Sequence, residues 1–175
     1  NMNIQEYISS LPGWMNYFGF EEISVHPDFK ALKVFKRKKL EATKFGNELI
    51  YIIVNEINSG YDFNKLVSLS TENFRYVNEL MSFYSEGIKG FGTMMVNFNL
   101  FLTESFNNDM YKFSIEYKPK HFAAAEFPSI LDLSTNNLYF LRDTPIWGFA
   151  YYDGYRKRSY EFFSPNSWQT ISTTK

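Results

Sequence analysis

The segment from Trp147 to Arg156 carries the side chains with the clearest capacity to bind another molecule. Its rings offer apolar contact area, and its hydroxyl, carboxylate and guanidinium groups can form directed hydrogen bonds. Tyr, Trp and Arg contribute most at protein interfaces, and a guanidinium can stack on a ring while its edge still donates. We predict that a groove for a ligand or a partner is lined or flanked by Trp147, Tyr151, Tyr152, Asp153, Tyr155 and Arg156.

The same segment also fits an ordinary packing role. On a helix, one face would hold Trp147, Tyr151, Gly154, Tyr155, Arg158 and Phe162. Gly154 on that face would let a strand approach closely, although glycine costs a helix about 1 kcal/mol. Packing on a sheet is therefore the alternative to a groove. The wider stretch 118–163 is the least ordinary part of the chain, and it also holds Lys120, His121 and Glu126.

A second pattern, Glu116-x-Lys118, is typical of metal-dependent nucleases when it lies on a strand. Residues two apart share a strand face, and Asp62 or Asp109 could supply a further carboxylate. The same alternation occurs in any half-exposed strand, so the nuclease-like enzyme is the weakest of our functional hypotheses. We expect no metal-dependent activity on nucleic acids.

Other catalytic patterns are missing from the sequence. His26 and His121 are the only histidines, they lack ligand spacing, and there is no Cys. The glycines Gly87, Gly90 and Gly92 follow an expected helix, whereas a phosphate loop precedes one. No Gly-x-Ser-x-Gly motif is found. The sequence therefore favours a non-enzymatic protein with no catalytic residues, no metal and no cofactor.

Charge and composition limit the classes of partner. The net charge is −1, from 18 basic and 19 acidic residues, so no overall field favours nucleic acid. We interpret the basic runs 36–39 and 156–158 as solvated faces. No run reaches the roughly 20 apolar residues of a membrane span, and no signal peptide is visible. We therefore expect a cytoplasmic protein without a membrane partner. The abundant Asn, Ile and Lys suggest a bacterial source with AT-rich codons.

The apolar pattern predicts the elements that position these residues. The chain has 19 Phe, 13 Tyr and 3 Trp but no Cys, so its core must be built without disulfides. We predict a helix over 71–88, a helix from Thr144-Pro145 to about residue 163, and three antiparallel hairpins. The hairpins pair 31–38 with 49–57 around a turn at 45–47, 93–103 with 111–118, and 130–133 with 138–141. Phe98 lies on the more apolar face of its strand.

These elements predict an α+β fold: a single domain over 1–163, with a mainly antiparallel sheet and helices packed on one face, followed by a polar tail over 164–175. The leading functional hypothesis is a protein-interaction module, immunity-like or regulatory, that binds a protein partner. The alternative is a small-molecule binding protein with an aromatic pocket. The sequence leaves the partner, the ligand and the oligomeric state open.

Overall fold

A computed structural model describes residues 1–40, 47–83 and 93–174. Within these ranges, every helix is too short or too polar to cross a lipid bilayer. In chain order the elements are α1 (Ile4–Tyr17), β1 (Glu21–Ile23), β2 (Lys33–Leu40), β3 (Asn47–Glu56), α2 (Phe63–Phe83), β4 (Thr93–Thr103), α3 (Asn108–Glu116), β5 (Ala124–Asp132), β6 (Asn137–Phe140), the 3-10 helix η1 (Ile146–Gly148), α4 (Tyr152–Phe163) and α5 (Pro165–Thr173).

The described strands form one six-stranded sheet in the order β1-β2-β3-β4-β5-β6. Strand β3 pairs with β4, and β4 with β5, in parallel, while the three outer pairs are antiparallel. The α+β class is thus confirmed, but the expectation of a mainly antiparallel sheet is wrong. The two parallel pairs arise because α2 and α3 connect consecutive strands as crossovers.

The expected strand over 111–118 is helical instead. Asn107 caps α3, because its side-chain oxygen accepts from the backbone N–H of Met110. The large apolar residues at 111, 113, 115 and 117 alternate as in a strand, but Met110, Phe113 and Ser114 also match the helical period and are the residues buried. The hairpin predicted for 93–103 and 111–118 is therefore wrong, and α3 leads to β5 instead.

The other two hairpins are confirmed. Strands β2 and β3 pair antiparallel with Val34 opposite Ile53, and β5 and β6 pair antiparallel with Ile130 opposite Tyr139. Residues 45 and 46 of the expected turn, and the Gly87, Gly90 and Gly92 set, lie outside the described residues. Residues 71–83 of the predicted helix belong to α2, which begins earlier, at Phe63, and residues 84–88 lie outside the described residues.

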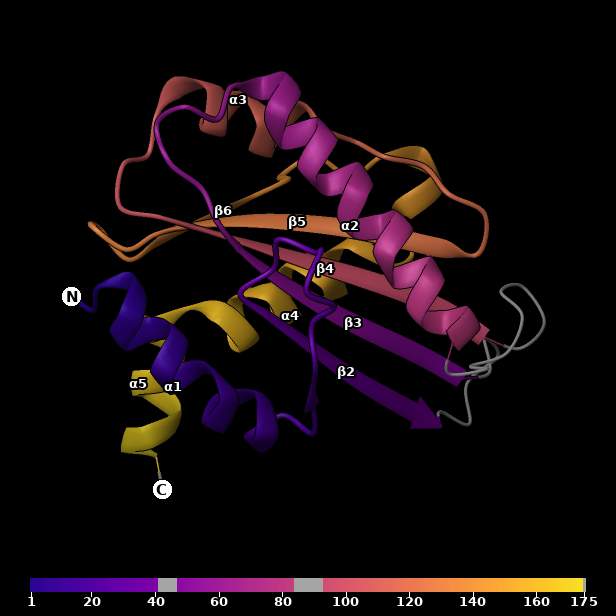
Figure 1. Ribbon diagram of the computed structural model, residues 1–175, viewed down its shortest axis with the longest axis horizontal. Helices are drawn as coiled ribbons and strands as arrows, with labels where there is room; N and C mark the ends of the chain where they lie inside the picture. Colours follow the sequence, from indigo (N-terminus) through magenta and orange to yellow (C-terminus); the bar gives the residue numbers. More distant parts are fainter. Residues whose placement is uncertain (41–46, 84–92, 175) are drawn as a thin grey trace.

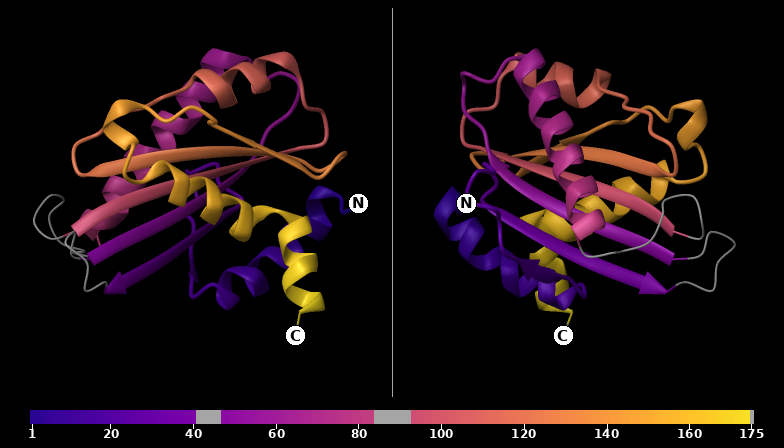
Figure 2. Two further views of the ribbon diagram at one scale, coloured as in Figure 1. Left: turned by 180° about the vertical axis from the view of Figure 1, so that it is seen from behind. Right: turned by 45° about the vertical axis from the view of Figure 1, so that its right-hand side comes forward.

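Helices cover both faces of the sheet, which corrects the expectation of helices on one face. Helices α2 and α3 lie on one side and α1, α4 and α5 on the other (Figures 1 and 2). The central strands explain this arrangement, since residues 49–54 of β3 and 95–103 of β4 are buried on both faces. A sheet that is buried on both faces needs a covering layer on each.

The C-terminal residues pack as part of this second layer. The residues expected to form a polar tail contain α5, and the Trp168 ring on α5 stacks on Tyr7 and Trp14 of α1, with ring centroids 4.9 and 5.4 Å apart. The single helix expected from residue 145 is divided into η1 and α4. This division shapes the candidate site, because Trp147 lies on η1 and three of the tyrosines lie at or just after the start of α4.

Candidate binding site

A cavity of about 220 Å³ opens where the loop before β5 meets η1 and the start of α4. The loop residues, the first residues of β5, Met94 of β4 and the aromatic segment face one another across it. Its lining residues are Met94, Pro119, Lys120, His121, Ala123, Ala124, Ala125, Trp147, Gly148, Tyr151, Tyr152 and Tyr155. The cavity thus joins two segments, 119–125 and 147–155, that are distant in sequence.

Four of the six residues predicted for a groove line this cavity: Trp147, Tyr151, Tyr152 and Tyr155. Tyr152 and Tyr155 are also core residues, since they are 4% and 2% exposed and pack on Phe127. The sequence left open whether this segment packs on the sheet or lines a groove. Tyr152 and Tyr155 pack on the sheet and also line the cavity. Whether the cavity receives a partner stays a prediction.

Arg156 does not line the cavity but holds the segment that leads into it. Its guanidinium donates to the Leu141 carbonyl (2.8 Å), to the Asp143 carbonyl (2.6 Å) and to Thr144 Oγ1 (2.9 Å). It also donates to Asp153 Oδ1 (2.9 Å), but that carboxylate is 97% exposed and the pair is worth well under about 1 kcal/mol. Arg156 therefore positions η1, and Asp153 lies outside the cavity.

The phenols of Tyr152 and Tyr155 are shielded from water. Burial raises the pKa of Tyr152, and the nearby Trp147 side chain opposes this rise. Burial likewise raises the pKa of Tyr155, although Arg158 opposes it. Both phenols therefore stay protonated at neutral pH and keep a hydroxyl hydrogen to donate.

Gly148 is needed for this arrangement. A Cβ built at Gly148 would overlap the Tyr152 ring at Cδ1 and Cε1. We expect Gly148→Ala to displace Tyr152 and to close or reshape the cavity, at a cost of about 1–3 kcal/mol. Urea unfolding and the methyl NMR shifts of Ala124 would measure both effects. Gly154→Ala is the matched control, because no atom lies within 4 Å of a Cβ there. Equal, small effects of the two substitutions would contradict this role of Gly148.

The opposite wall is held by a buried carboxylate. Glu126, 2% exposed, accepts a hydrogen bond from the Tyr117 hydroxyl (2.8 Å), and its Oε1 lies 3.3 Å from His121 Nε2. Burial, followed by the Glu126 charge, raises the pKa of Tyr117, so the phenol remains a donor. The His121 ring also stacks on Phe74 of α2, with centroids 3.7 Å apart. Glu126 and Phe74 thereby fix His121 at the cavity wall.

A layer of amides continues from Glu126 between the sheet and α2. Asn97 lies opposite Glu126 in the sheet and donates to Asn99 Oδ1 (3.2 Å), which also accepts from Asn73 (3.0 Å). Asn99 in turn donates to Ser70 Oγ (3.0 Å). All four side chains are fully buried. Because buried polar groups need partners, this network fixes how α2 sits on the sheet behind the cavity.

The 119–125 wall also has one strained residue. Ala123 has φ of +49°, in the left-handed region that non-glycine residues seldom adopt. Its carbonyl accepts from the backbone N–H of Met95 at the start of β4 (3.4 Å). Strained residues persist where surrounding contacts enforce them. The conformation turns the chain so that Phe122 points outward while Ala123 and Ala124 line the cavity.

Three exposed apolar side chains belong to residues that are next in sequence to residues lining the cavity. Ile146, Phe122 and Phe149 are 90%, 81% and 80% exposed, and they are the three most exposed large apolar residues in the described ranges. We call Phe122, Ile146 and Phe149 the apolar rim. Trp147, at 45% exposure, connects the rim to the cavity.

The cavity lining includes the ammonium of Lys120 and no carboxylate. Lys120 Nζ lies 5.5 Å from the Trp147 ring centroid, close enough for a cation–π contact. Two neighbouring cations have internal acidic partners, Lys118 with Asp143 (3.5 Å) and Arg156 with Asp153. Lys120 has no carboxylate partner among residues 1–40, 47–83 and 93–174.

The residues of the nuclease hypothesis are not brought together on a strand. Glu116 ends α3 and is exposed, whereas Lys118 follows the helix and pairs with Asp143. Asp62 accepts from the backbone N–H of Lys65 at the start of α2, and Asp109 lies in the first turn of α3. The described part of the chain holds no group of three or more acidic, histidine or cysteine residues placed to bind a metal ion.

Sequence reasoning identified one wall of the site, and only the fold reveals the other. The basic run at 36–39 is also more than a solvated face, since Arg37 donates to the Phe18 carbonyl (2.8 Å) and lies over the Phe20 ring. The Arg158 guanidinium of the basic run 156–158 makes two contacts with Glu48, at 2.7 and 3.2 Å.

Comparison with protein-family models, with curated proteins and with solved structures finds no match to this chain.

Proposed function

We propose that this protein is a protein-interaction module that docks a partner on the apolar rim, with the cavity taking an anchoring side chain. The observation that carries the proposal is that Phe122, Ile146 and Phe149 are highly exposed and that each is next in sequence to a residue lining the same cavity. Single exposed apolar residues are ordinary, whereas a contiguous exposed patch is typical of an interaction site. Trp147 and the tyrosines supply the aromatic centre that interfaces favour.

The size of the cavity favours a partner over a free small molecule. Small-molecule sites commonly have about 300–1,000 Å³, whereas this cavity has about 220 Å³. Such a volume suits a single amino-acid side chain. An anchor in a central pocket, surrounded by apolar contacts that exclude water, is the usual arrangement of an interface hot spot.

The test compares two matched double variants. We expect Phe122→Ser with Phe149→Ser to lose a partner that the wild-type protein retains from an extract of its own cells. The control, Tyr17→Ser with Tyr111→Ser, removes two exposed rings elsewhere, 50% and 49% exposed, and should retain that partner. The captured protein is then purified and its dissociation constant measured against all three. Equal affinity for the rim variant and the control would contradict the proposal.

A further inference from the structure

We infer that the side chain anchored in the cavity is acidic: a carboxylate of the partner lies beside Lys120, and the apolar residues that flank it in the partner cover the rim. This inference rests on the proposed function and names the chemistry of the anchor. Charge complementarity supports it, because the Lys120 ammonium lines the cavity and no carboxylate is among the lining residues.

The ammonium is available to a ligand. Lys120 is exposed, and its described contact is with the Trp147 ring, which leaves the hydrogen-bonding positions of the ammonium open. Neighbouring acids are already engaged, since Asp143 pairs with Lys118, and Glu126 lies behind His121 with Tyr117 as donor. An ammonium and a carboxylate form the strong, charge-assisted type of hydrogen bond.

The aromatic wall alone would suit a cation equally well, because rings attract cations through their faces. Lys120 disfavours a cationic side chain in the cavity, because its ammonium already lies over the Trp147 ring and would repel a second positive charge. The phenol of Tyr152 stays protonated, because burial raises its pKa, and so offers a donor and no negative charge. The cavity therefore combines positive charge, neutral phenols and apolar walls.

The test uses three acetylated and amidated heptapeptides that differ only at the central residue. Each has Leu and Phe on both sides of a central Glu, Gln or Lys, with Ser at both ends, so that the central residue sets the charge. We expect the Glu peptide to bind the wild-type protein about tenfold more tightly than the Gln peptide, with a difference that shrinks as salt rises. Isothermal titration calorimetry measures the affinities.

The Lys120→Met variant tests whether the charge of Lys120 causes this preference, because Met keeps an apolar side chain next to Trp147 but removes the charge. It should abolish the preference for Glu over Gln, whereas Lys157→Met, at an exposed position of α4 outside the cavity, should preserve it. The inference is overturned if the Glu and Gln peptides bind equally, if the Lys peptide binds best, if none binds at 1 mM (on the order of the weakest measurable affinities), or if the preference survives in Lys120→Met.

The same peptides separate this inference from the proposed function. Phe122→Ser with Phe149→Ser should weaken all three peptides by a similar factor, because the rim contacts their common flanking residues. If the rim variant weakens them but no acidic preference exists, the docking surface stands and the acidic anchor is rejected. If the peptides bind equally well to the rim variant, the docking surface itself is rejected.

Discussion

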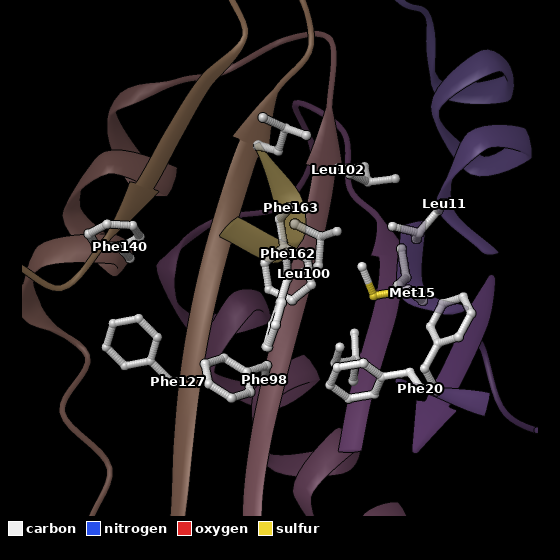
Figure 3. Close-up of a cluster of buried hydrophobic side chains, with 14 of the residues drawn as sticks. Leu11, Met15, Phe20, Phe98, Leu100, Leu102, Phe127, Phe140, Phe162 and Phe163 are labelled. Carbon is white, nitrogen blue, oxygen red and sulfur yellow. The ribbon is translucent and has the colours of Figure 1, made fainter. Parts of the chain in front are cut away.

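Phe98→Ala is expected to lower the free energy of unfolding by about 3–5 kcal/mol. Phe98 is fully buried in the middle of β4, where its ring packs edge-on against Tyr155 and Phe163, with centroids 5.9 and 6.3 Å away. Figure 3 shows it among the labelled phenylalanine rings on one face of the sheet. Truncation removes these contacts and leaves a cavity that rigid neighbouring strands cannot fill.

Urea unfolding would measure this loss, and Phe149→Ala provides a matched control. The chemical change is the same, but Phe149 is 80% exposed, so we expect a change within about 0.5 kcal/mol. Because typical domains are stable by about 5–15 kcal/mol, Phe98→Ala leaves a weakened but measurable protein. A loss below about 1 kcal/mol would mean that Phe98 is not at the centre of the core.

The two phenylalanines also separate stability from binding. Phe98 does not line the cavity but packs on Tyr155, which does, whereas Phe149 lies on the rim and is largely exposed. Phe149→Ala should therefore impair docking without loss of stability. This division is typical of a site in which a rigid core holds the anchor pocket and exposed residues provide the surrounding contacts.

The sequence predicted at least part of each strand from β2 to β6, but it missed β1 and predicted a strand where α3 lies. Alternation along 93–103 placed Phe98 on a buried face, and the structure confirms it. The opposite face carries Asn97 and Asn99, which resemble solvent-facing residues. Both are buried under α2: Asn99 bonds to Asn73 and Ser70 of that helix, and Asn97 donates to Asn99. A pairing between side chains far apart in sequence cannot be read from local periodicity, so the second helical layer was not predicted.

The same reason limits what could be predicted of the site. The aromatic content of 147–155 indicated one wall, because residue type alone suggests interface chemistry. The contact of that wall with 119–125 depends on β5 lying beside β4 in parallel, which in turn depends on α3. Asn107 as an N-cap residue and Asp109 in the first turn together form a helix-start signal, and this signal would have predicted α3. Nothing local to Lys120 indicates that it lies over Trp147.

The second large effect is expected at alkaline pH, where buried tyrosines make the protein less stable. Burial raises the pKa of Tyr7, whose hydroxyl donates to the Phe163 carbonyl (2.7 Å), and burial also raises that of Tyr155. In the unfolded chain both phenols ionise near pH 10. Above that pH the unfolded state binds fewer protons than the folded state, so stability that is fully present below pH 10 is lost as the pH rises.

At pH 11 these two tyrosines alone should lower the free energy of unfolding by about 3 kcal/mol relative to pH 9, since each contributes about 1.4 kcal/mol per pH unit. Urea unfolding between pH 8.5 and pH 11 measures how the free energy of unfolding changes with pH.

The Tyr7→Phe variant isolates the part of this change that is due to Tyr7. At pH 8.5 that variant should be less stable than the wild type by about 1 kcal/mol, because the hydrogen bond to Phe163 is lost. As the pH rises through 10 the gap should close and then reverse, because phenylalanine has no proton to lose in the unfolded state. A constant difference in stability between variant and wild type across this range would show that the Tyr7 phenol ionises alike in the folded and unfolded chain. The complete burial of Tyr7 argues against that result.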